Sequence, residues 1–303
     1  MVGKEETGKT VKPAAPRFTH HVAIDWSGAS GRRHKGIAVA MIGQHDPAPM
    51  LIRPGHIWSR EEVLDWVIQE TPPETLIGFD LGQSLPFVDC GAFFPEWDQS
   101  PPSARDLWAL VDGICAQDAD LGAHSFVEHA QASRHFRRHG GRQGDLFPPG
   151  RGRMRVTELA QARAGCQPTS NLNLVGASQV GKSSLTGMRL FHRLPPTIPV
   201  WPIDDVPEQG RVVVEIYTTL AAMAAGRRAG RSKIRSRVDL AQALAALGCE
   251  EDEPTQAPLS DHASDALITA AWLRTASAQR KFWYPQALTP HLAHTEGWTF
   301  GVA

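Results

Sequence analysis

Runs of apolar residues near the start of the chain predict two strands joined as a hairpin. Residues 21–26 and 36–42 have the length and composition of buried strands. The segment between them, 27–35, is rich in Gly and Arg and reads as a turn. A short third strand is expected around 50–52. The chain therefore opens with strands that we expect to be antiparallel.

A helix and a fourth strand are predicted next. Ser59 and Glu62 have the spacing of a capping box, and Pro72 and Pro73 end the helix that the box begins. Residues 75–80 form an apolar run short enough for an interior strand. The helix has one apolar stripe, made of Val63, Leu64, Val67 and Ile68. The first 90 residues thus read as three strands, a helix and a strand.

Later elements are predicted at wider intervals. Ser103 caps a helix, and the β-branched run 211–217 has the composition of a central strand. Two further helices are expected over 239–247 and from 260 or 261 to about 275. The sequence therefore predicts an α/β fold, with a large helical and loop insertion at about 90–200 in one domain over 19–303.

The net charge and the spacing of the cysteines exclude several classes of protein. The chain has 31 Lys and Arg against 32 Asp and Glu, so its formal net charge is -1. It is therefore not a globally basic nucleic-acid coat, and a charged partner must be recognised by a local patch. The four cysteines form no Cys-x-x-Cys pair, which argues against a zinc ribbon or a disulfide framework.

The chain carries no pattern of a signal peptide or membrane span. Residues 1–18 mix Gly, Lys, Thr, Pro and Ala and are expected to be a disordered tail. No stretch approaches the roughly 20 apolar residues of a membrane-spanning helix. We therefore expect a cytoplasmic protein that does not insert in membranes; oligomeric state stays open.

Acidic residues end or follow three predicted interior strands. Asp25 and Asp80 each close an apolar run, and Glu215 follows three valines. A carboxylate buried without a partner costs several kcal/mol, so such acids usually hold something cationic. Each one alone fits equally well as a turn former or a helix cap. Together they favour a functional cluster.

The last predicted helix adds further candidates. Asp261 and Asp265 share one face because they are four residues apart, and His262 lies one turn from Asp265. Asp261 also fits as no more than a cap. Hard divalent cations take oxygen ligands, and paired metals can stabilise both the attacking water and the leaving oxygen of a phosphodiester. The sequence therefore predicts a Mg²⁺ or Mn²⁺ site.

The order of these motifs resembles the ribonuclease H-like superfamily, closest to RuvC-type resolvases. Further segments are similar to the domain of unknown function 429 family, whose members are predicted nucleases. These segments are 77–86, 180–187, 200–202, 214–217 and 264–266. The resemblance covers about 21–275 and implies a mixed five-stranded sheet, its first three strands antiparallel, flanked by helices. It implies that Asp25, Asp80 and Asp265 are metal ligands and that Glu215 is a further acid or a structural residue. His262 or Asp261 would serve the second metal.

A competing motif lies at 176–183, which matches the phosphate-binding pattern G-x-x-x-x-G-K-[ST] completely. The motif needs a buried strand directly before it, and the preceding segment, 169–175, is too polar for a central strand. A nucleotide-binding ATPase or phosphotransferase that uses this loop remains an alternative. An actin-like ATPase that uses the Asp25 hairpin is another, since that class shares the sheet.

Two basic segments are candidates for contact with nucleic acid. Segment 226–237 has six basic residues and no acid, and Lys233, Arg231 and Arg235 in it could neutralise phosphates. Segment 133–163 carries ten Arg and His side chains and is expected to be a mobile excursion. Either segment could equally be solvated surface. The sequence therefore favours a metal-dependent nuclease, with a non-catalytic nucleic-acid-binding module as a further alternative.

Overall fold

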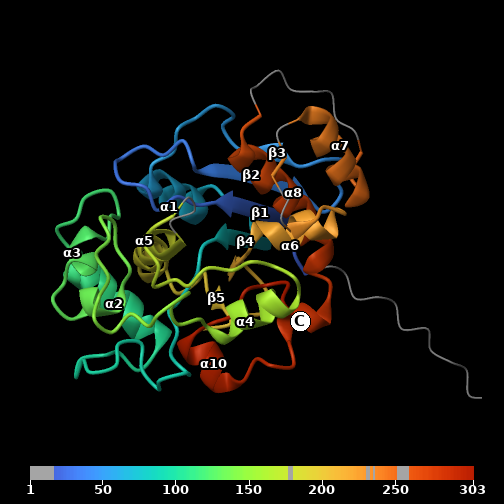
Figure 1. Cartoon of the computed structure of the whole chain (residues 1–303). Helices are drawn as coiled ribbons and strands as arrows, with labels where there is room; N and C mark the ends of the chain where they lie inside the picture. Colours follow the sequence, from blue (N-terminus) through green and yellow to red (C-terminus); the bar gives the residue numbers. More distant parts are fainter. Residues whose placement is uncertain (1–16, 177–179, 230–232, 235, 251–258) are drawn as a thin grey trace, which may run out of the picture.

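A mixed six-stranded sheet forms the centre of the protein. The computed structural model describes residues 17–176, 180–229, 233–234, 236–250 and 259–303. The strand order is β3-β2-β1-β4-β6-β5 (Figure 1). The strands are β1 His20–Asp25, β2 Ala38–Gly43, β3 Met50–Leu51, β4 Thr75–Asp80, β5 Val200–Trp201 and β6 Val212–Glu215.

The direction of the strands changes at β1. The pairs β1-β2 and β2-β3 are antiparallel, whereas β1-β4, β4-β6 and β6-β5 are parallel. The predicted antiparallel start of the sheet is confirmed. The predicted number of strands, five, is wrong, because β5 adds a sixth at the edge beside β6. Its two residues are too few to show a strand period in sequence.

Each face of the sheet is covered by helices, and each face buries its own apolar cluster. One cluster joins alternate residues of the central strands, such as Ile24 and Phe79, to α1, α2 and α5. The other joins the intervening residues, such as Ala23 and Val214, to α6, α7 and α8. The two groups of helices lie on opposite sides of β1 and β4 in Figure 1. Their bounds are α1 Arg60–Gln69, α2 Ala104–Ile114, α5 Val180–Arg193, α6 Thr218–Ala224, α7 Arg237–Ala246 and α8 Asp261–Ala276.

The predicted helix boundaries are largely confirmed, because local capping sets them. Ser59 and Glu62 form the expected capping box of α1. Ser103 caps α2 and Ser260 caps α8 through their hydroxyl groups. Side-chain acceptors at these positions satisfy amide donors that have no partner inside the helix.

The segment between β4 and β5 is packed more firmly than its basic composition suggests. It contains α3 His124–Val127, the 3-10 turn Ala132–His135 and α4 Val156–Arg163 besides α2 and α5. Arg153 and Arg155 are buried. The expectation of a mobile basic excursion over 133–163 is therefore wrong for these arginines, since buried acceptors hold them.

The two ends of the described chain pack against the second cluster. Phe18 is buried and stacks on Trp283 of α9, which spans Arg280–Trp283. The predicted disordered tail, 1–18, is therefore wrong at Phe18. Residues 1–16 lie outside the described residues. After α10 Pro290–Thr295, Trp298 and Phe300 are fully buried in the same cluster.

Candidate functional site

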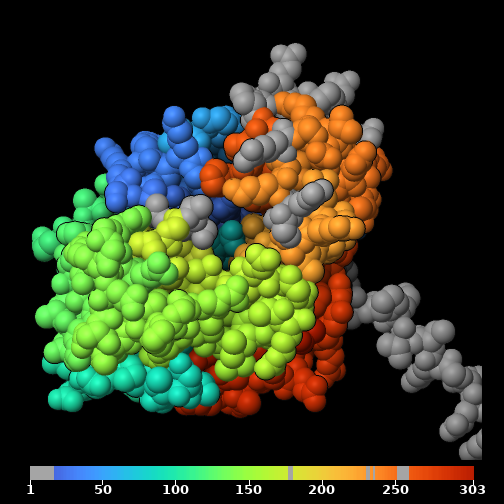
Figure 2. Space-filling view, in the orientation of Figure 1, coloured from blue at the N-terminus to red at the C-terminus, as the bar shows by residue number. Residues whose placement is uncertain are grey.

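Asp25 and Asp80 lie side by side at one edge of the sheet. They are direct register partners at the carboxyl ends of the parallel strands β1 and β4. Neighbouring strands are about 4.8 Å apart, and partners in register point to the same face. Figure 2 shows the surface hollowed where the deep blue and teal of these two strands are visible. The sequence prediction that these two acids meet is confirmed.

Helix α8 brings Asp265 and His262 to the same face. The helix packs closely on β1 and β2, with Ala266 and Ala270 fully buried along its length. His262 Nδ1 lies 2.9 Å from Asp25 Oδ2. The His262 ring also passes Gly36, where an added Cβ would lie 3.4 Å from Nε2. The hairpin, β4 and α8 therefore contribute to one cluster.

The three aspartates influence one another's pKa values. Burial raises the pKa of Asp80 well above its usual value, and repulsion from Asp25 and Asp265 raises it further. Burial and the charge of Asp25 raise the pKa of Asp265 to about 7. Like charges that share a buried site disfavour full ionisation. Asp80 and Asp265 therefore keep their protons to higher pH than isolated carboxyl groups do.

Two cationic groups offset part of the negative charge of these aspartates. Burial raises the pKa of Asp25, while the hydrogen bond and charge of His262 and the charge of Lys233 oppose that rise. The bond to Asp25 raises the pKa of His262. Lys233 Nζ lies 3.4 Å from Asp261 Oδ2, although its side chain is 66% exposed. Asp261 therefore joins the edge of the cluster as the partner of Lys233.

Thr218 was not predicted from sequence. Its hydroxyl, at the start of α6, donates to Asp80 Oδ2 over 3.4 Å. Strand β6 runs parallel to β4, so a helix that starts directly after β6 begins at the same edge of the sheet. In the sequence, the only indication of this role was the pair of threonines, 218 and 219, directly after the predicted central strand.

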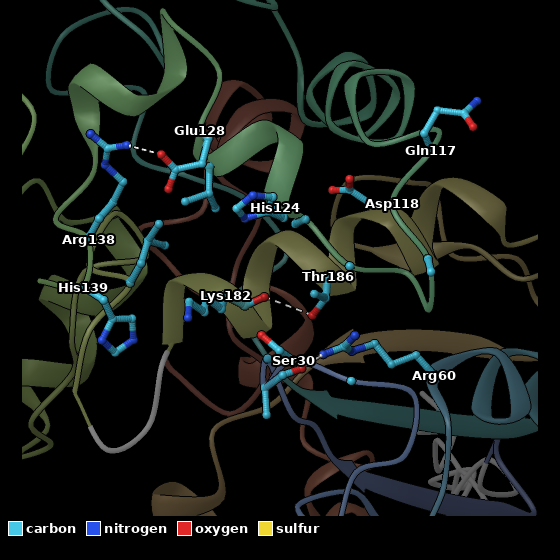
Figure 3. A pocket seen from close by; sticks show the side chains of 18 of the residues that line it. Ser30, Arg60, Gln117, Asp118, His124, Glu128, Arg138, His139, Lys182 and Thr186 are labelled. Atoms are coloured by element: carbon cyan, nitrogen blue, oxygen red, sulfur yellow. Dashed lines mark hydrogen bonds and ion pairs between the residues drawn. The ribbon is translucent and has the colours of Figure 1, made fainter. Parts of the chain in front are cut away.

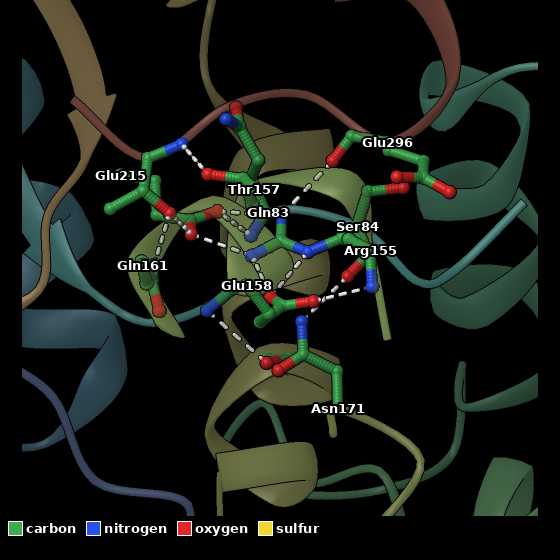
Figure 4. Close-up of polar contacts among 12 residues, drawn as sticks. Gln83, Ser84, Arg155, Thr157, Glu158, Gln161, Asn171, Glu215 and Glu296 are labelled. Atoms are coloured by element: carbon green, nitrogen blue, oxygen red, sulfur yellow. Dashed lines mark hydrogen bonds and ion pairs between the residues drawn. The ribbon is translucent and has the colours of Figure 1, made fainter. Parts of the chain in front are cut away.

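Glu215 lies outside this cluster, which corrects its expected place among the catalytic acids. Its register partner is Phe79, one residue before Asp80, so the pleat directs the two carboxylates to opposite faces. Arg155 donates to both Glu215 oxygens over 2.6 and 2.8 Å, and the Gln83 amide donates over 2.7 Å (Figure 4). Arg155 also pairs with Glu158, and its side chain is 1% exposed. Glu215 is thus a structural residue, the alternative that the resemblance left open.

The basic loop after β6 is described only in part. Arg231 and Arg235, expected to bind substrate, lie outside the described residues. Lys233 is described, and its charge acts on both Asp25 and Asp265.

The phosphate-loop match at 176–183 has the wrong local structure in its described part. No strand is assigned in 169–176, within the described residues that precede α5. Residues 177–179 lie outside the described residues. Gly181 packs against backbone instead, since an added Cβ would lie 2.4 Å from the Asn171 carbonyl oxygen. The strand-loop-helix context that the motif needs is absent from these residues.

The donors fit a hard cation in type, but they are not arranged around one point. Carboxylate oxygens are the ligands that Mg²⁺ and Mn²⁺ prefer. Within the described residues, no group of three or more His, Cys, Asp and Glu side chains has metal-binding geometry. One oxygen of Asp25 already faces His262. The described donors therefore suit a hard cation in chemical type but do not have the geometry of a formed metal site.

Comparisons of the chain with protein-family models, curated proteins and solved structures found no match. Among the described residues, no helix combines the length and apolarity needed to cross a bilayer. The function is therefore argued from the site itself.

Proposed function

We propose that the protein is a metal-dependent nuclease that hydrolyses phosphodiester bonds at the Asp25-Asp80-Asp265 cluster. The observation that supports this most is that three remote segments bring these carboxylates to the same sheet edge. Burial raises the pKa values of Asp80 and Asp265, and repulsion from neighbouring aspartates raises them further. Perturbed carboxylates in a surface hollow are typical of functional sites. We propose the ribonuclease H-like fold on the same basis.

The three aspartates would hold Mg²⁺ or Mn²⁺. When bound, the cation supplies Lewis-acid stabilisation of the charge that develops on phosphate oxygens. Thr218 fixes the Asp80 carboxylate through its hydroxyl. His262 fixes Asp25 through Nδ1 and carries a proton beside it. These contacts reduce the freedom of two ligand groups before the substrate arrives.

His262 and Lys233 would balance the negative charge of the substrate. The His262 side chain is 46% exposed, and Lys233 is more exposed still, so both can face a phosphodiester in the hollow. Lys233 contributes positive charge on the solvent side of the carboxylates. Phosphate binding by such groups weakens as salt concentration rises.

Cleavage assays test the proposal. End-labelled single-stranded and duplex DNA and RNA are incubated with the full chain and Mg²⁺, Mn²⁺ or EDTA. We expect cleavage with metal and a loss of at least about 100-fold in Asp25→Asn or Asp80→Asn, since each removes a ligand charge. Asp65→Asn changes an exposed acid on α1 and should leave the rate unchanged.

The proposal fails if the purified protein cleaves none of these substrates with either metal. It also fails if cleavage occurs and Asp25→Asn retains it. Glu215→Gln separates the two groups of acids: it should lower stability and leave the rate per folded molecule within a few-fold of the original.

A further inference from the structure

A cavity lies against residues 28–31 of the hairpin loop that follows β1. It has a volume of about 550 Å³. Residues 28–31, which begin three positions after Asp25, form one wall, and α3 and the start of α5 form others (Figure 3). Gly28 touches α5 so closely that a Cβ would lie 2.6 Å from the Lys182 carbonyl carbon. The loop therefore links this cavity to the cluster.

The lining carries more positive than negative charge. Four permanent cations, Arg60, Arg138, Arg142 and Lys182, line it, against the two carboxylates of Asp118 and Glu128. Glu128 is shared by Arg138 and Arg142, each 2.8 Å away. Asp118 accepts from the amide and hydroxyl of Ser125. The carboxylates thus do not neutralise the cavity.

Among the described residues, neither Arg60 nor Lys182 forms a salt bridge, although the charges of Glu61 and Asp120 act on Arg60. Arg60 is 1% exposed and donates to the backbone carbonyls of Ser27, Ala29 and Asp120. Lys182 is half-buried, burial lowers its pKa, and its ammonium has no partner among the residues that the structure describes. Partial burial makes the Lys182 ammonium costly, so an anionic group beside it would be favoured.

The cavity also has an apolar wall. Ala29, Ala123, Val127 and Leu174 lie along it, with the rings of His124 and His139 nearby. A nucleotide is recognised by such a combination, with cations for its phosphate and apolar or aromatic surface for its base. The volume lies in the usual range for a small-molecule site.

We propose that this cavity, the Lys182 pocket, binds one unpaired nucleotide of a single-stranded nucleic acid whose neighbouring phosphodiester lies at the Asp25 cluster. The inference rests on the proposed nuclease function and names its substrate class. A duplex cannot enter, since its bases are stacked and paired and must leave the helix first. Lys182 contacts the phosphate, and the apolar wall contacts the base.

Binding without metal tests this separately from cleavage. A fluorescein-labelled 12-nucleotide thymidine strand is titrated with the full chain in EDTA, followed by anisotropy. We expect Lys182→Ala and Ser30→Trp each to weaken binding about fivefold or more, through lost charge and a filled cavity. Ser30 is exposed on the loop, so its replacement should not disturb folding. Lys281→Ala on α9 removes one remote charge and should change affinity less than twofold.

Further titrations in the same anisotropy assay identify the class of ligand. Asp25→Asn should bind the strand with unchanged or higher affinity in EDTA, because it removes negative charge outside the pocket. A duplex of the same length and free thymidine monophosphate should both bind at least tenfold more weakly than the single strand. Equal binding of the duplex overturns the single-strand assignment, and equal binding of the monophosphate overturns the strand proposal.

The two proposals fail in different ways. If Lys182→Ala and Ser30→Trp bind the strand like the original protein, the Lys182 pocket is not a nucleotide site, whatever the cleavage assay shows. If both variants lose binding while no cleavage occurs with metal, the pocket proposal stands and the nuclease proposal fails.

Discussion

Neighbouring residues on one strand can have opposite roles because side chains alternate across a sheet. Phe79 points into the cluster that contains α5, whereas Asp80 shares its face with Asp25. Glu215 pairs in register with Phe79 and so meets Arg155. The sequence predicted an acid at each strand end, but the face depended on strand register, which sequence alone did not supply.

Asp265 should make stability depend on pH. Its pKa rises from 3.8 in the unfolded chain to about 7 in the fold, so between these values the folded state binds more protons. Stability should therefore fall as pH rises from about 4 to about 7. Asp265→Asn removes this penalty and should stabilise the metal-free protein at pH 8 by about 1–2 kcal/mol, with no gain near pH 4. Urea unfolding in EDTA measures both.

Asp65→Asn provides the matched control, since it removes an exposed acid from α1. Its effect should be small at both pH values. A stabilisation of Asp265→Asn that is equal at pH 4 and pH 8, or a destabilisation at pH 8, would contradict the placement of Asp265 beside other acids.

The buried Arg155 should matter far more to stability than an exposed arginine. Arg155→Met leaves the carboxylates of Glu158 and Glu215 buried without their cation, and we expect a loss of about 3–5 kcal/mol. Arg193 is 39% exposed and shares Asp112 with Arg189, so Arg193→Met should cost less than about 1 kcal/mol. Equal losses in urea unfolding would disprove the structural role of Arg155.

Several helices that begin with a local capping signal were predicted from sequence, whereas elements that depend on contacts between distant segments were not. The capping residues Ser59 and Ser103 are read directly from sequence and begin α1 and α2. The start of α8 was left open between 260 and 261, and the structure has Ser260 as its cap and Asp261 as its first residue. The edge strand β5 was missed because two residues show no period. The start of α6 at the acidic edge depends on β6 running parallel to β4, which is a property of the assembled sheet.

Gly28 is expected to fix the hairpin loop against α5. A Cβ there would lie 2.3 Å from the Ser183 amide nitrogen, which belongs to the backbone and cannot rotate away. Gly28→Ala should therefore destabilise the protein by about 1–3 kcal/mol. Gly113 on α2 has nothing within 4 Å of an added Cβ, so Gly113→Ala should be neutral or stabilising by about 0.5–1 kcal/mol. Thermal unfolding of both variants distinguishes these outcomes, and a neutral Gly28→Ala would contradict the contact.

At the scale of the whole molecule, the C-terminal segment closes the second core. Thr299 forms an isolated bridge with Glu215, and Trp298 and Phe300 are fully buried. No element was predicted after about residue 275, so the short helices α9 and α10 were missed, although Thr289 and Pro290 are a capping signal for α10. Residues 297–303 have no regular structure, so neither hydrophobic period nor capping signals could predict where they pack.

Removal of residues 297–303 should therefore prevent stable folding. Truncating a buried Trp or Phe costs about 3–5 kcal/mol. The loss of two such side chains would remove most of the free energy of unfolding of a typical domain, which is about 5–15 kcal/mol. Removing only the exposed Ala303 is the control and should change little. A shortened chain that retains a cooperative thermal transition in circular dichroism would contradict this role.

The proposed function requires Asp25, Asp80 and Asp265 to bind divalent cations together. Titration of the metal-free protein with Mn²⁺, followed by electron paramagnetic resonance of the free ion, measures this binding. We expect binding by the original chain and by Asp65→Asn, and at least about tenfold weaker binding when any one of the three aspartates is replaced by Asn. Mn²⁺ binding that is absent from the original chain, or unchanged in the three variants, would contradict the account.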